Sequence, residues 1–112
     1  MKKNEIIKDR LEEWVESKGF LNPRLTIIEL CKIIGINRTY LSNYINHIYG
    51  LNFNLWINHL RIEEAKLLMV QPPKRNLSEI AERIGFTDLA HFSKQFKFQE
   101  GVSPSEWRKN NM

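Results

Sequence analysis

The sequence predicts an all-α fold of about seven helices, in which two similar helical units are joined by a long central helix. Three observations predict it. Segments with strand-like alternation are nearly absent, apolar residues recur at helical spacing, and residues typical of helix starts and helix ends alternate along the chain. The 112 residues suffice for one compact domain, and an apolar fraction of 42% is ordinary for a globular protein.

The first segment, residues 1–19, is expected to be an amphipathic helix. Ile7, Leu11 and Trp14 fall on one face of it, and Gly19 is predicted to end it. Trp14, like the two other tryptophans, lies on an apolar face and is expected to anchor the core.

The second segment, residues 20–51, contains two further helices separated by Gly35. Thr26 and Glu29 have the spacing of a capping box, in which a hydroxyl and a carboxylate satisfy backbone N–H groups at a helix start. Asn37 is placed to cap the helix that follows the glycine.

The third segment, residues 52–71, predicts a long helix that begins after Asn52 and is ended by two prolines. Its expected apolar face comprises Phe53, Trp56, Ile57, Leu60, Leu67 and Leu68. A face this wide indicates a helix held by both halves of the molecule. Arg61 on the same helix is expected to pair with an acidic residue such as Glu64, or with a neighbouring helix end.

The last segment, residues 76–110, repeats the same start signals. Asn76 and Glu79 form a second capping box, Asp88 is placed to cap the next helix, and Ser103 begins a C-terminal helix.

The second and fourth segments are copies of one pattern. Glu29, Leu30, Ile34 and Gly35 match Glu79, Ile80, Ile84 and Gly85 at an offset of 50, and Ser42, Ile45, Gly50, Leu51 and Trp56 match Ser93, Phe96, Gly101, Val102 and Trp107 at an offset of 51. Each copy is a helix, a glycine-containing turn and a second helix, which is the helix-turn-helix signature. Residues 20–51 are therefore predicted to be a first helix-turn-helix, and residues 76–110 a second one followed by the C-terminal helix.

The two copies also resemble a known family. The segment LTIIELCKIIGINRTYLSNYINHIYGLNFNLWINHLRIEEAKLLM resembles the first half of an AraC-type (AraC/XylS) DNA-binding domain, and NLSEIAERIGFTDLAHFSKQFKFQEGVSPSEWRKN resembles the second. The pieces EIA, GF, HFSKQFK and G followed by SPSEWR lie in the family's order and spacing, and the resemblance covers about residues 20–110.

The resemblance implies a bacterial transcription regulator that binds double-stranded DNA sequence-specifically. Both recognition helices are expected to enter successive major-groove segments on one face of the duplex. In the family this domain is usually the C-terminal part of a longer regulator, so the expected partners are DNA, RNA polymerase and a sensing or dimerisation domain that lies outside this chain.

In the first copy, DNA contacts are expected on the second helix, because that helix enters the major groove. Leu41, Tyr44, Ile45 and Ile48 are predicted to face inward, which leaves Arg38, Thr39, Ser42, Asn43 and Asn46 outward. The resemblance places base contacts chiefly at Thr39, Ser42 and Asn43. Arg38 suits a phosphate or a guanine, and Asn43 suits adenine through a bidentate amide pair.

In the second copy the residues expected to point outward are Leu89, Ala90, Ser93, Lys94 and Lys97. The resemblance places base contacts at the first four of these. Leu89 and Ala90 suit thymine methyl groups, Lys94 suits a guanine edge or a phosphate, and Lys97 suits a phosphate. Tyr40 and His91, which the repeat pairs, are expected to reach the DNA backbone with a hydroxyl or a ring N–H.

The first recognition helix departs from the family pattern, which often has arginine where Asn43 stands and lysine near Asn46 or His47. The segment NRTYLSNYINH has one arginine and no lysine. Since phosphate contacts dominate affinity, this half either binds weakly alone or serves mainly to discriminate sequences. The residues leave both options open, and a protein-interaction module whose first motif does not bind DNA is the alternative function.

Composition argues against other function classes. The net charge of +4 is compatible with nucleic acid but does not by itself identify it. Cys31 is the only cysteine, and His47, His59 and His91 lack the spacing of metal ligands, so no metal, cofactor or catalytic site is predicted and the chain is not expected to be an enzyme. The chain has no signal-peptide core and no apolar run near the ~20 residues that span a bilayer, so we expect a cytoplasmic protein without membrane contact.

Overall fold

The computed structural model describes residues 3–112, and every regular element in that range is helical. The elements are α1 (Lys3–Glu16), the 3₁₀ turn η1 (Gly19–Leu21), α2 (Ile27–Ile34), α3 (Arg38–Tyr49), α4 (Phe53–Val70), α5 (Leu77–Arg83), α6 (Leu89–Glu100) and α7 (Pro104–Asn110). Seven α-helices and no strand among residues 3–112 confirm the all-α prediction. Residues 1 and 2 of the predicted first helix lie outside the described residues.

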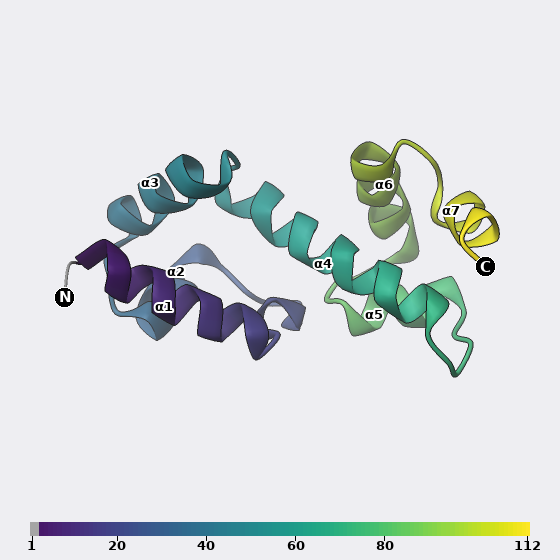
Figure 1. Ribbon diagram of the computed structural model, residues 1–112, viewed down its shortest axis with the longest axis horizontal. Coiled ribbons are helices and arrows are strands. Elements are labelled where there is room, and N and C mark those ends of the chain that lie inside the picture. The colour runs from purple at the N-terminus through teal and green to yellow at the C-terminus, as the bar shows by residue number, and fades with distance from the viewer. Residues whose placement is uncertain (1–2) are drawn as a thin grey trace.

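The molecule is elongated, with extents of 46 × 25 × 22 Å. Figure 1 shows α4 running through the middle, with α1, α2 and α3 around its first half and α5, α6 and α7 around its second half. The long central helix is therefore a shared element of both ends.

Side chains cap the helices at the predicted positions. Backbone N–H groups donate to Thr26, Asn37, Asn52, Asn76, Asp88 and Ser103, each from the residue three positions later and at 2.7–3.2 Å. Each such bond satisfies one of the donors that a helix start leaves without an intrahelical partner. The predicted helix starts are confirmed.

The end of the first helix differs from the prediction. α1 ends at Glu16, and the residue in the left-handed region is Lys18, with φ of +62°, rather than Gly19. Gly19 is needed for another reason: a Cβ there would lie 2.1 Å from Nε1 of Trp14. The glycine marks a close approach between the turn and the tryptophan, which the sequence pattern alone does not distinguish from a helix stop.

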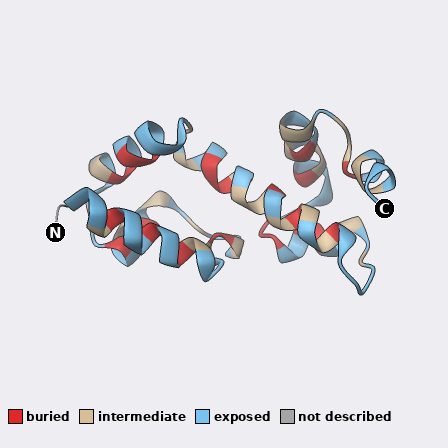
Figure 2. Ribbon diagram, in the orientation of Figure 1, coloured by how far each residue is buried: buried red, intermediate tan, exposed pale blue. Residues whose placement is uncertain are grey.

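Two hydrophobic cores lie along α4, one in each half (Figure 2). The first core contains Trp14 and Trp56, whose ring centroids are 6.0 Å apart. In the second core the half-buried Trp107 packs edge-on against Phe96 at 6.0 Å. Leu21 packs against both clusters, so the two cores are continuous through the η1 turn.

Two apolar residues that were predicted to face neighbouring helices are exposed instead. Ile48 is 52% exposed and Leu67 is 50% exposed. Residues 47–50 are all exposed, although the Tyr49 ring stacks on Trp56 of α4 at 4.9 Å between centroids. Helical periodicity predicts which face of a helix is apolar, but it does not predict how far along the helix a neighbour covers that face.

The repeat also relates α1 to α4, through an arginine on each helix. Arg10 on α1 and Arg61 on α4 are 51 residues apart, the same offset that relates α3 to α6. A Cβ built on Gly35 would lie 3.0 Å from the Arg10 guanidinium, and one on Gly85 would lie 3.0 Å from the Arg61 guanidinium. Each half is therefore a three-helix unit in which an arginine of the first helix meets the glycine turn.

Arg61 was predicted to pair with an acidic residue or with a neighbouring helix end, and the structure shows the second. Its guanidinium donates to the carbonyl oxygens of Phe20 and Asn22, at the end of η1, and both distances are 2.8 Å. Glu64 pairs with Lys18 instead, at 2.9 Å. Arg61 thus binds a neighbouring helix end rather than an acidic side chain.

Candidate DNA interface

Two equivalent recognition helices are the central feature of the candidate interface. α3 and α6 both have 12 residues, and both follow a glycine turn with positive φ, +86° at Gly35 and +96° at Gly85. Each begins with a side-chain cap and ends at a left-handed glycine. In Figure 1 the two helices stand at the same edge of the molecule, on either side of the first half of α4.

The outward face of α3 is polar. Arg38, Thr39, Ser42, Asn43 and Asn46 are all exposed, as predicted. The opposite face of α3 buries Leu41, Tyr44 and Ile45 in the first core. The buried face fixes the rotation of α3, and the five polar side chains therefore lie together on the surface.

Tyr40 occupies a different environment from its neighbours on α3. It is half-buried, its hydroxyl donates to Oδ1 of Asn4 at 2.5 Å, and Lys3 Nζ lies 4.2 Å from its ring centroid. The side chain is therefore engaged with α1, and its expected contact with the DNA backbone stays a prediction.

The outward face of α6 is more cationic and more apolar. Leu89, Ala90, His91, Lys94 and Lys97 are exposed, and Ser93 is half-buried. The His91 ring packs edge-on against Phe86 at 5.0 Å between centroids. Phe92 and Phe96 are fully buried beneath this face and hold α6 in place.

The repeat makes the difference between the two faces explicit. At the offset of 51, Asn43 and Asn46 of α3 correspond to Lys94 and Lys97 of α6. The same two equivalent positions therefore carry neutral amides in the first helix-turn-helix copy and ammonium groups in the second. The outward face of α6 thus carries two cations, Lys94 and Lys97, and that of α3 carries one, Arg38.

Sequence reasoning missed one exposed residue on α6. Phe98 is 78% exposed and follows Lys94 by four residues, so the two lie on the same side of the helix. Helical spacing could have placed Phe98 on the outward face of α6, since Ala90, Lys94 and Phe98 follow one another at intervals of four residues.

Metal ligands and the single cysteine bear on whether the chain does chemistry other than binding. Residues 3–112 contain no group of three or more histidine, cysteine or acidic residues that could hold a metal ion. Burial raises the pKa of the Cys31 thiol, although the nearby Arg38 charge acts to lower it. A raised pKa reduces the thiolate fraction, and with it the reactivity of this cysteine. In the same range no helix has both the length and the apolarity needed to cross a membrane.

Comparison with known families identifies the fold. The model of a family described as a helix-turn-helix domain matches residues 30–110. The chain belongs to the AraC-type helix-turn-helix family. A relative among characterised proteins is the Msm operon regulatory protein of Streptococcus mutans, 32% identical over 85 residues, which cover 76% of this chain and 30% of the relative. The chain thus spans about a third or less of the length of the first curated relatives that it matches.

Two solved structures have the same architecture. The C-terminal domain of AraT, a response regulator from Geobacillus stearothermophilus, superposes with a TM-score of 0.83 at 29% identity, covering 96% of this chain and 86% of that one. The DNA-binding domain of AdpA, solved in complex with a target DNA, has a TM-score of 0.79 at 19% identity and covers 93% and 90% of the two chains. At that identity the second likeness shows the shared fold alone.

Proposed function

We propose that this AraC-type domain binds double-stranded DNA sequence-specifically and thereby regulates transcription, with α3 and α6 in successive major-groove segments on one face of the duplex. The observation that carries the proposal is the pair of equivalent recognition helices at one edge of the molecule, joined through α4 (Figure 1). The AdpA domain, whose fold is shared, was solved on a target DNA.

α6 supplies most of the affinity in this proposal. Lys94 and Lys97 are exposed cations, so they neutralise phosphates or, for Lys94, bind a guanine edge. Leu89 and Ala90 at the start of the helix contact thymine methyl groups, and Ser93 donates to or accepts from a base edge.

α3 supplies sequence discrimination. Thr39, Ser42 and Asn43 contact base edges with hydroxyl and amide groups, and Asn46 lies further along the same exposed face. Arg38, at the first position of the helix, binds a phosphate or a guanine. The hydroxyl of Tyr40 and the ring of His91 are the remaining backbone contacts of the proposal.

For the whole protein we propose a cytoplasmic regulator in which this domain is joined to a sensing or dimerisation region and acts on RNA polymerase. The greater length of relatives such as the Msm operon regulatory protein supports the additional region.

Selection of bound sequences from randomised duplexes, followed by footprinting, tests the proposal. We expect two protected major-groove segments about 10 bp apart, one for each recognition helix. A single protected segment would restrict DNA binding to one helix, and failure to retain any duplex at low salt would contradict the proposal.

A salt titration on the selected duplex tests the role of α6. Lys94→Ala should flatten the plot of log K against log salt by about 0.9, because one phosphate contact is lost. Lys8→Ala is the matched control, since Lys8 is an exposed lysine on α1 that pairs with Glu12. Equal slopes for the two variants would show that Lys94 contacts no phosphate.

A further inference from the structure

Phe98 is the most exposed of the large hydrophobic side chains in the described part of the chain. It belongs to neither of the two cores, so packing does not account for an aromatic residue there. The equivalent residue of the first unit is His47, which is also exposed. The fold of the repeated unit therefore accepts a polar residue at this position, so the phenylalanine is not required for folding and can serve another role.

Phe98 forms one wall of a groove between α6 and α4. Leu55, Gln95 and Phe98 line two hollows of 490 and 230 Å³. Lys94 and Lys97 complete the larger hollow, and no carboxylate contributes to its lining. The larger hollow thus has a largely apolar floor and a cationic rim.

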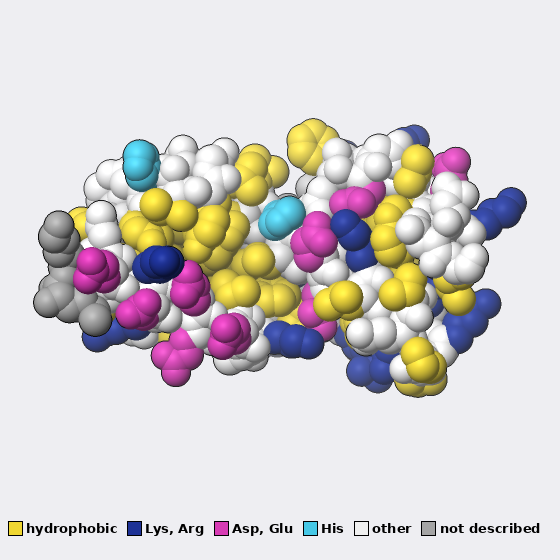
Figure 3. Space-filling model, in the orientation of Figure 1, with side chains coloured by type: hydrophobic (Ala, Val, Ile, Leu, Met, Phe, Trp, Pro, Cys, Tyr) yellow, Lys and Arg dark blue, Asp and Glu magenta, His cyan; other side chains and the backbone are white. Residues whose placement is uncertain are grey.

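The groove lies between the start of α4 and the recognition helix α6. Leu55 is in the first turn of α4, and three residues separate α4 from the end of α3. The opposite wall of the groove is α6 itself. Figure 3 shows the upper outline of the molecule indented between its two halves. Lys94 and Lys97 belong both to this groove and to the proposed DNA-contacting face, so the two surfaces are continuous.

The chemistry of the groove fits one strand of the DNA backbone. A sugar–phosphate strand alternates anionic phosphates with deoxyribose rings, whose carbon atoms are apolar. Lysines at the rim suit the phosphates, and the exposed faces of Phe98 and Leu55 suit the sugars. An acidic protein segment would also match the charge, but the continuity with the recognition face favours DNA.

We propose that this groove holds a sugar–phosphate strand of the DNA segment between the two major-groove sites, with the Phe98 ring packed on a deoxyribose. The inference rests on the proposed function and adds to it a contact next to the recognition face of α6. It makes Phe98 a positioning residue that sets how the intervening DNA lies against the protein, and hence how far it bends.

Phe98→Ala tests the proposal on the selected duplex. Affinity should fall about tenfold, the effect of losing one buried aromatic contact, while the salt slope stays that of the wild type because no charge is removed. Leu67→Ala is the matched control: Leu67 is a half-exposed apolar residue on α4 that lines a different hollow. Thermal unfolding should be unchanged in both variants, since neither side chain belongs to a core.

Hydroxyl-radical footprinting locates the contact, because the radical attacks deoxyribose. Wild type should protect sugars between the two major-groove segments, and Phe98→Ala should lose that protection while keeping both major-groove footprints. Wild-type affinity and an unchanged footprint for Phe98→Ala would overturn the inference, and the proposed function would stand if Lys94→Ala still weakened binding. Reduced transcription with unchanged DNA affinity would assign the groove to a protein partner and would also overturn it.

Discussion

The Arg61 side chain donates its Nε–H to the carbonyl oxygen of Phe20 across 2.8 Å, and so joins the central helix to the turn that follows α1. A second N–H of the same guanidinium reaches the carbonyl oxygen of Asn22. Gly85, in the turn before the second recognition helix, packs against this arginine and against the carbonyl oxygen of Leu21. One side chain therefore fixes the second unit against the first.

Arg61→Ala should lower the free energy of unfolding by about 1–3 kcal/mol, because two backbone carbonyl groups lose charged donors. Arg61→Lys should recover only part of the loss, since an ammonium lacks the planar fork that reaches both carbonyls. Urea denaturation measures both. Arg83→Ala is the control: Arg83 is 54% exposed and pairs loosely with Glu79, so its loss should cost under about 0.5 kcal/mol. Equal effects at positions 61 and 83 would show that the junction does not depend on Arg61.

Gly85→Ala and Gly101→Ala should differ although both glycines have positive φ, +96° and +83°. A Cβ at Gly85 would lie 2.8 Å from the Leu21 carbonyl oxygen, whereas one at Gly101 would meet nothing within 4 Å. Thermal unfolding should show a cost of about 1 kcal/mol at Gly101, from backbone conformation alone. The cost at Gly85 should be about 2–4 kcal/mol, because the turn must also move away from η1. If the two variants melt together, the close packing of the two units at Gly85 is refuted.

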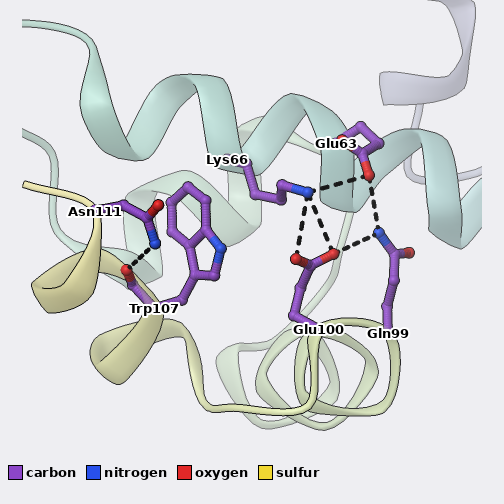
Figure 4. Close-up of polar contacts among 6 residues, drawn as sticks. All are labelled: Glu63, Lys66, Gln99, Glu100, Trp107 and Asn111. Atoms are coloured by element: carbon purple, nitrogen blue, oxygen red, sulfur yellow. Dashed lines mark hydrogen bonds and ion pairs between the residues drawn. The ribbon is translucent and has the colours of Figure 1, made fainter.

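The ion pairs of Lys66 should stabilise the folded protein until Lys66 loses its proton at alkaline pH. In Figure 4 its ammonium lies between Glu63 and Glu100, at 3.3 Å from each carboxylate, and Gln99 bridges the same two acids. Burial acts to lower the pKa of Lys66, but the hydrogen bonds and charges of Glu100 and Glu63 outweigh it and raise the pKa above its ordinary value of 10.5.

Because the folded pKa is raised, this contribution to stability is complete below about pH 10.5 and is lost as the pH rises through the folded value. The difference in unfolding free energy between wild type and Lys66→Met should therefore be constant near neutral pH and shrink above pH 10.5. Lys109→Met, at an exposed position on α7, should show no such pH dependence. A constant difference up to high pH would mean that the ion pairs contribute nothing.

Asn43→Lys should strengthen DNA binding, because it gives α3 the cation that α6 has at Lys94. The affinity should rise several-fold at low salt, and the salt slope should steepen by about 0.9 for one added phosphate contact. Asn110→Lys adds the same charge at an exposed position on α7 and should change the slope little. Identical slopes for the two lysine variants would place Asn43 outside the DNA contact.

Local signals in the sequence accounted for the helix starts, because a capping side chain acts within three residues of its own position. They also predicted that Leu41, Tyr44 and Ile45 form the buried face of α3. What they missed depends on distant neighbours. Gly19 is required by Trp14. A helix end was one of two predicted partners for Arg61, but which helix end it binds depends on a turn 41 residues earlier in the chain. The exposure of Ile48 and the groove beside Phe98 likewise depend on where other helices end, which no single-segment pattern contains.

Leu21 belongs to the surroundings of both cores, and this has a consequence for affinity. When two binding modules belong to one rigid body, the binding of the first holds the second close to its own target. The second module then experiences that target at an effective concentration in the millimolar range or above. In the proposed function, a weakly charged α3 would then need little intrinsic affinity to remain on the DNA, because α6 would hold the domain there.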